Sequence, residues 1–189
     1  MTAEELMKKL SDDKTYQERN HLKDLEIKRN HDLLAKEYEQ FSNDCKKFGY
    51  SLETAWDLIM VEESYSDLIP VLINYLAEKN HSPKFREGIA RALAVYDSSP
   101  YFNKILELYY ESKDEHESVH WAIACALSAA AITQDQLDVI EKLILNKDIG
   151  NDRNALLDSI PKMKGEQRIR VVDYAKSDLQ LKINLKNIK

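Results

Sequence analysis

The chain has 189 residues and a net charge of −6, and its length is sufficient for one domain with a sizeable core. Only four glycines and four prolines stand beside abundant Leu, Ala, Glu and Lys, a composition that favours helix. It holds no apolar run near the ~20 residues of a membrane span, no apolar signal core and no disulfide framework, so we expect a cytoplasmic protein without membrane contact.

Residues 1–50 are predicted to form a helical extension. A short helix over Glu4–Leu10 is followed by Ser11-Asp12-Asp13, whose side-chain oxygens can cap a second helix. That helix runs from about Lys14 to Phe48 without Pro or Gly, and Gly49 can end it in the left-handed conformation. At ~1.5 Å per residue it is on the order of 50 Å long.

The two halves of this long helix differ in character. Its first half, Gln17–Asp32, is mostly charged and is expected to project or to be lightly covered. Apolar residues then recur every seven positions and predict a packing seam of Ile27, Leu34, Phe41 and Phe48, interleaved with Tyr38 and Cys45. The seam fits either the protein's own first repeat, which we favour, or a coiled-coil dimer, so we expect a monomer.

The stretch Glu117–Ala131 is predicted to be a helix built to be sandwiched. Small residues at Ala122, Ala126 and Ala130 lie within one buried stripe and allow close approach of a neighbouring helix. The pair Ala126-Leu127 has counterparts at Ala92-Leu93, 34 residues earlier, and at Ser159-Ile160, 33 residues later. A second helix precedes each stretch, predicted over Asp67–Ala77, Phe102–Glu111 and Gln134–Leu145. Three helix pairs at this period indicate an α-solenoid.

Shorter elements complete a single domain, 1–189. A short helix over Leu52–Met60, which contains Trp56, is expected to close the first layer. Gly150 is expected in the left-handed conformation, and Pro161 should end or kink the last inner helix. A final helix over Gly165–Lys176 can cap the open end with Ile169, Val172 and Ala175. The expected parts are therefore the extension 1–50, the repeats 51–163, and the cap and tail 164–189.

The segments VHWAIACALSA, FREGIARALAV and NDRNALLDSI resemble the HEAT-repeat superfamily of armadillo-like α-solenoids. With the long charged helix before Gly49 and Trp56-Asp57-Leu58, the chain also looks like a group of small bacterial HEAT-repeat proteins of unassigned function. The resemblance implies an all-α, right-handed solenoid, protein binding as the default role and no catalytic residues. Val119-His120 departs from the usual Val-Arg of that family, which interrupts the arginine ladder formed by Arg86, His120 and Arg153.

In a HEAT solenoid the second helix of each pair lines the concave side, so Trp121 should lie in that groove. The periodicity places Cys125 beside it, and the aligned positions in the first and third repeats are Glu87, Arg91, Asn154 and Asp158. A tryptophan flanked by charges on such a surface is typical of a binding anchor. The equally weighted alternative is that the N-terminal helix or the C-terminal tail covers Trp121.

No catalytic motif is found in the sequence, and we expect neither a metal nor an organic cofactor. His116 and His120 are spaced to share a metal on one helix face, but histidines at an acidic helix start are more often solvated. Cys125 would need a nearby base to act as a nucleophile, and spacing nominates none. We therefore expect a protein that is not an enzyme.

The distribution of charge along the chain distinguishes two possible functions, binding of a protein segment and processing of DNA. Residues 51–150 carry a net charge of −9, whereas residues 151–189 carry +4. An acidic middle opposes binding along a phosphate backbone, so we expect no nucleic-acid partner. The favoured function is a small adaptor or inhibitor that grips a protein segment in its groove. The alternative is a HEAT-like DNA-processing enzyme of the alkyl-base glycosylase type, whose groove would have to be basic.

Overall fold

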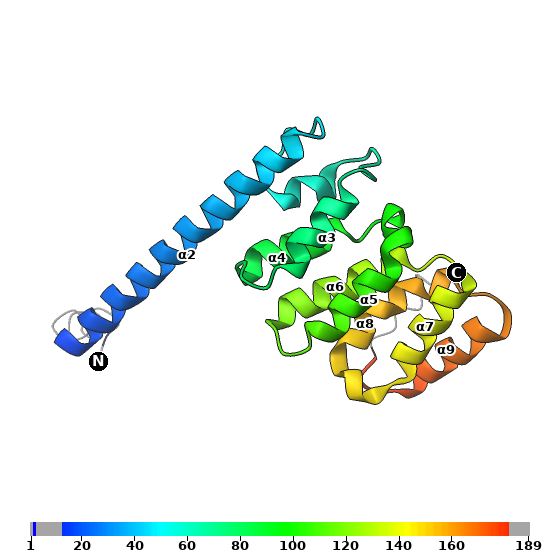
Figure 1. The fold of residues 1–189 in the computed structure, drawn as a ribbon. Coiled ribbons are helices and arrows are strands. Elements are labelled where there is room, and N and C mark those ends of the chain that lie inside the picture. The colour runs from blue at the N-terminus through cyan, green and yellow to red at the C-terminus, as the bar shows by residue number, and fades with distance from the viewer. Residues whose placement is uncertain (1, 3–12, 182–189) are drawn as a thin grey trace.

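The computed structural model describes residues 2 and 13–181, and every regular element in that part of the chain is a helix (Figure 1). The expected helix over Glu4–Leu10 and the tail beyond Leu181 lie outside the described residues. Within the described residues, the prediction of an all-α protein is confirmed. No described helix is both long enough and apolar enough to cross a membrane.

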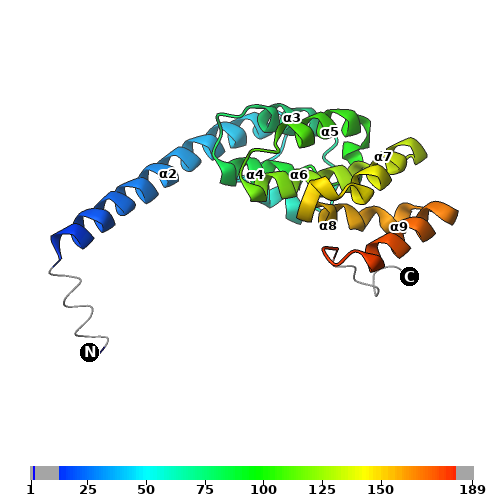
Figure 2. The same cartoon turned by 90° about the horizontal axis from the view of Figure 1, so that it is seen from below.

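Helix α2 spans Lys14–Lys46 and projects from the body of the protein (Figures 1 and 2). Asp13 caps its start, since the Asp13 carboxylate accepts a hydrogen bond from the Thr15 N–H at 2.9 Å. Gly49 follows the helix at φ +88°, a backbone conformation that glycine adopts without steric cost. The expected long helix and its glycine stop are therefore confirmed, with an end two residues earlier than predicted.

The predicted seam of α2 is wrong at both of its ends. Phe41 and Cys45 are fully buried, and Leu34 and Tyr38 pack partly against the core. Ile27 is 58% exposed because the body of the protein begins only at Leu34, so this residue lies on the projecting part. Phe48 is 45% exposed because it lies in the turn after the helix has ended.

Helices α3 to α8 form two rows (Figure 2). The first row contains α3 (Ile69–Ala77), α5 (Phe102–Glu111) and α7 (Gln134–Leu145). The second row contains α4 (Pro83–Ala92), α6 (Glu117–Ala130) and α8 (Arg153–Leu156), which continues as the 3₁₀ helix η4 (Leu157–Lys162). Helix α6 packs between α4 and α8, and also against α5 of the first row.

The small residues of α6 explain how it fits between two neighbours. Ala122, Ala126 and Ala130 are fully buried, as are Ile123 and Leu127 between them. Because alanine side chains are small, the backbones of α4 and α8 can approach α6 closely. The larger side chains of α6 fill the core between the rows. The predicted buried stripe is confirmed.

The 3₁₀ helix η1 (Ala55–Met60) lies between α2 and α3, whereas η2 (Tyr96–Tyr101) and η3 (Lys147–Asp152) connect the two rows. Gly150 has φ +70° and ψ −137°, so its positive φ is as expected but its ψ is not left-handed helical. The chain continues through this glycine into further helical turns instead of ending a helix there. Pro161 lies within η4, and the α-helix before it ends at Leu156.

Helix α9 (Gly165–Ser177) covers the end of the two rows, packed against α7 and η4. Val171 and Ala175 are its buried apolar residues, with Val172 partly buried. Ile169 is 62% exposed, so its expected place in the cap is wrong. Ile169 stands two positions, a rotation of about 200°, before Val171, so it lies on the opposite side of the helix from Val171 and Ala175, which share a face four residues apart.

Candidate functional site

Arg86 and Arg153 are buried arginines that join one helix pair to the next. Arg86 donates from Nη2 to the Leu76 carbonyl at 2.7 Å and from Nη1 to the Glu115 carboxylate. Arg153 is fully buried and donates from Nη1 to Asp178 Oδ2 at 2.9 Å and, more weakly, to the Ile144 carbonyl at 3.4 Å. Each guanidinium therefore holds the end of a first-row helix and a carboxylate further along the chain.

His120 occupies the middle position of this ladder. Its Nε2 lies 3.2 Å from Asp152 Oδ2, and its Nδ1 lies 2.7 Å from Ser112 Oγ. Its ring stacks on Tyr109 with centroids 4.5 Å apart. Burial lowers the pKa of His120, an effect that Asp152 partly offsets, and burial raises the pKa of Asp152.

Each of the three predicted ladder positions thus pairs with one carboxylate, and the sequence analysis did not identify Glu115, Asp152 or Asp178. These acids follow their partners by 29, 32 and 25 residues. The irregular spacing explains why a period of 33 to 34 residues could not reveal them.

The predicted binding residues all lie on second-row helices, and we call them the second-row face: Glu87, Arg91, Trp121, Cys125, Asn154 and Asp158. Arg91 and Glu87 make an ion pair at 2.9 Å, and the Arg91 guanidinium lies 5.6 Å from the ring centroid of Trp56. Trp56 packs tightly on α4, where a Cβ added at Gly88 would come 2.8 Å from its Nε1 atom. This contact anchors η1 on the first repeat, as the sequence predicted for the short helix.

Trp121 is half-buried and packs partly against the core, and Cys125 one turn later is also half-buried. Burial raises the pKa of the Cys125 thiol, while the charge of Arg91 lowers it and that of Asp158 raises it. Charges from α4 and η4 therefore surround this part of α6. Asp158 is exposed.

Asn154 is the member of this face that the C-terminal segment engages. Its Nδ2 donates to the Gln180 carbonyl at 3.1 Å and to the Asn151 carbonyl at 3.0 Å. The alternative, in which the N-terminal helix or the C-terminal tail covers Trp121, stays a prediction, because this contact of the tail is with Asn154.

Lys162 caps the C-terminal end of α6, a role that the sequence analysis missed. Its Nζ donates to the carbonyls of Ser128, Ala129 and Ala131 at 2.9, 2.8 and 3.2 Å. A cation at this end of a helix satisfies carbonyls that have no partner within the helix. Burial lowers the pKa of this ammonium group.

Glu37 fixes the projecting helix to the first repeat and was also missed. This buried carboxylate accepts hydrogen bonds from the Ser82 N–H at 2.6 Å and from the Ser82 hydroxyl at 2.5 Å, and it lies 3.2 Å from His81 Nδ1. Ser82 is the N-cap residue of α4, so the carboxylate sits at the favourable end of that helix.

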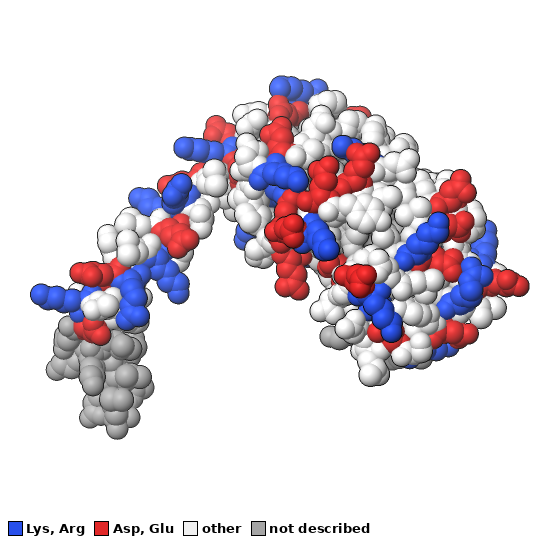
Figure 3. Space-filling view, turned by 60° about the horizontal axis from the view of Figure 1, so that its bottom comes forward, with Lys and Arg blue, Asp and Glu red and all other residues white. Residues whose placement is uncertain are grey.

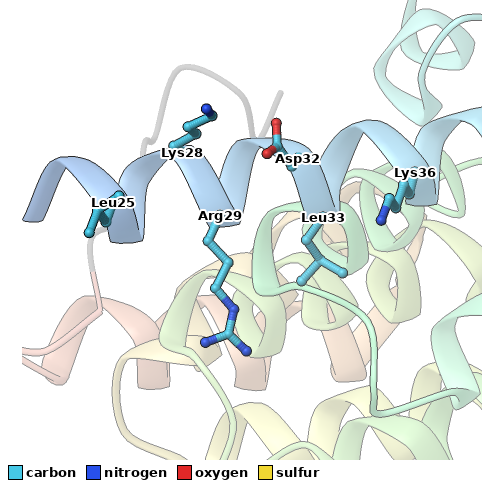
Figure 4. Close-up of a pocket in the computed structure, with 6 residues that line it drawn as sticks. All are labelled: Leu25, Lys28, Arg29, Asp32, Leu33 and Lys36. Carbon is cyan, nitrogen blue, oxygen red and sulfur yellow. The ribbon is translucent and has the colours of Figure 1, made fainter. Parts of the chain in front are cut away.

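A cleft of about 680 Å³ opens between α2 and the N-terminal ends of α4 and α6. Its lining includes Leu33, Leu34, Trp56, Pro83, Glu87 and His116. A second hollow, shown in Figure 4, has six residues of α2 in its lining. There Leu25, Arg29 and Leu33 point to one side of the helix and Lys28 to the other. Within the described part of the chain no second element lines that hollow, so the lining described there is a helix surface.

Among the described residues, no group of three or more His, Cys, Asp or Glu side chains is arranged to hold a metal. His116 caps α6, where its Nδ1 accepts a hydrogen bond from the Ser118 N–H at 3.3 Å. Ser112, His120 and Asp152 have the residue types of a hydrolytic triad, but Ser112 is 1% exposed. Its hydroxyl donates to the Tyr109 carbonyl at 2.9 Å and is not presented to a substrate.

Comparison with known proteins adds no relative to this picture. No family model, no curated protein and no solved structure matches the chain.

Proposed function

We propose that the protein is a HEAT-type, right-handed α-solenoid that works in the cytoplasm as a non-catalytic interaction module. Its partner is a protein segment that binds on the second-row face. Two observations support the solenoid: the two rows of helices at a near-constant sequence period, and the ladder residues at equivalent positions in each layer.

The observation that carries the binding role is the environment of Trp121. This side chain is half-buried, so its ring is held in place by the core while part of its surface stays open. Tryptophan in such a position supplies a large, rigid contact at a low entropic cost. Arg91 on α4 and the exposed Asp158 on η4 place opposite charges on either side of α6. These charges suit a polar rim around an apolar anchor.

The charge pattern favours a protein over a nucleic acid. Lys and Arg side chains are interspersed with Asp and Glu on the face of the molecule shown in Figure 3. Binding along a phosphate backbone is dominated by cationic contacts, and residues 51–150 carry a net −9. The apolar cleft beside α2 adjoins α4 and α6 and can extend the binding surface past the first repeat.

Two variants of the second-row face test this proposal. Asp158→Lys reverses an exposed charge and should leave the unfolding free energy within about 0.5 kcal/mol of the wild type. Trp121→Ala removes a half-buried ring and should destabilise the fold by about 1–3 kcal/mol, between the exposed and the core case. Both variants should lose the partners that the wild-type protein captures from its native cytoplasm.

Asp173→Lys on α9 is the matched control, because Asp173 is also exposed and lies on a different helix. It should capture the same partners as the wild-type protein. Partners retained by both second-row variants would overturn the proposed surface. Tight binding of duplex DNA by the wild type, lost in Trp121→Ala, would instead favour the DNA-processing alternative.

A further inference from the structure

The middle position of the ladder differs from its two neighbours in lacking a permanent positive charge. Arginine carries a fixed positive charge in proteins, and Arg86 and Arg153 each pair with a carboxylate. His120 pairs with Asp152 through a single ring nitrogen, and burial favours its neutral form. Asp152 is only 16% exposed, so its carboxylate is largely removed from water without a fixed cation beside it.

A second difference concerns the end of the first-row helix. Arg86 donates to the Leu76 carbonyl, and Arg153 lies 3.4 Å from the Ile144 carbonyl as a donor. These two acceptors are 68 residues apart, which is twice the repeat period, and Tyr110 stands midway between them. The shorter His120 side chain contacts Ser112 Oγ instead. The middle layer, formed by α5 and α6, therefore has a carboxylate (Asp152) and the C-terminal end of a first-row helix (α5), but it has no arginine at the position of His120.

A cavity of about 320 Å³ is found at this layer. Its lining includes Tyr109, Tyr110, His120, Asn146, Asp148 and Asp152. Tyr110 is 58% exposed, and the buried Tyr109 hydroxyl has no hydrogen-bond partner among the described residues. Lys113 also lines the cavity, and Glu117 lies close enough to raise the pKa of Asp152 further. The carboxylates of Asp148, Asp152 and Glu117 thus outnumber the ammonium group of Lys113, so the cavity favours a cation.

We propose that this cavity binds an arginine side chain of a protein partner, with its guanidinium between Asp152 and the C-terminal end of α5. The inference rests on the proposed role in protein binding. A guanidinium is planar and can donate to a carboxylate and to a carbonyl at once, as the arginines of the neighbouring layers do. Tyr110 at the mouth supplies an aromatic face on which the group can stack.

The test uses Nα-acetyl-arginine amide as the probe, because it needs no knowledge of the partner. In NMR titrations of the full chain, the His120 and Tyr110 ring signals should shift saturably. Nα-acetyl-lysine amide should bind at least tenfold more weakly, because an ammonium group is not a planar fork that can donate to the Asp152 carboxylate and to a carbonyl of α5 at once. Equal binding of the two probes, or no saturable shift with the arginine probe, would overturn the assignment.

Two variants of the cavity complete the experiment. Asp152→Asn removes the charge and should weaken the arginine probe at least tenfold, whereas Asp173→Asn on α9 should leave its affinity unchanged. His120→Arg should fill the cavity from within and abolish probe binding. If Asp152→Asn binds the probe as the wild type does, the site is wrong. If the arginine probe does not bind while the protein captures its partners normally, this inference is overturned and the proposed function is unaffected.

Discussion

The three ladder residues show how one substitution changes the chemistry of a repeated position. Arg86 and Arg153 make charge-assisted contacts that persist across the physiological pH range. His120 takes the same position with an imidazole whose pKa is lowered by burial and whose ring stacks on Tyr109. Family resemblance drew attention to this position in the sequence. The acid that faces it, Asp152, came only from the structure, because no fixed spacing relates the acids to their partners.

The buried histidine leads to a prediction on pH. Burial lowers the pKa of His120 in the folded state below the ordinary value of about 6.5. Near pH 6.5 the unfolded chain therefore binds more protons at this residue, so its contribution to the unfolding free energy falls as the pH is lowered. In His120→Gln this contribution is absent. The unfolding free energy of the variant should therefore fall less between pH 7.5 and pH 6 than that of the wild type.

Urea denaturation of both proteins at the two pH values measures the difference. The raised pKa of Asp152 acts in the opposite sense, and this carboxyl group is present in both proteins. An equal or steeper fall in His120→Gln would show that His120 is not the group responsible.

At the scale of the elements, α2 separates what apolar spacing can predict from what it cannot. The seven-residue spacing correctly indicated Leu34, Phe41 and Cys45 as packing residues. The same spacing extends to Ile27, because periodicity records the helix face and carries no information on where the neighbouring body ends. Glu37 gave no apolar signal at all, although its carboxylate makes the polar contact between α2 and α4.

Deletion of residues 1–25 tests whether the projecting part of α2 contributes to the fold. Apart from the partly covered Tyr16, residues 13–25 are exposed, so the unfolding free energy should change by less than about 1 kcal/mol. Glu37→Ala, by contrast, leaves the Ser82 N–H without its partner and should cost about 1–3 kcal/mol. Thermal and urea unfolding of the truncated protein and of Glu37→Ala measure the two changes in unfolding free energy.

A truncated protein that aggregates or melts much earlier would show that this segment is packed. Sedimentation of the full chain would then distinguish packing on its own body from a dimer. The exposed Leu22 and Leu25 are the residues through which a second copy would pair.

For the whole molecule, the repeat period was the strongest signal in the sequence. Two first-row helices, α5 and α7, have the bounds that the sequence predicted. Polar contacts between layers could not be predicted, because they depend on side-chain reach across turns of different length. Lys162 illustrates this: it follows a proline at the end of its own layer, yet it caps the helix of the previous layer from 31 to 34 residues away. The partial cover over Asn154 likewise depends on where Gln180 returns in space.

The central claim is that a protein segment binds on the second-row face, and hydrogen–deuterium exchange of the complex with a captured partner tests it most directly. We expect added protection on α4, α6 and η4, around Arg91, Trp121 and Asp158. Exchange in α3 and α7 of the first row should be unchanged. Protection confined to the first row or to the projecting half of α2, with α6 unaffected, would contradict the account.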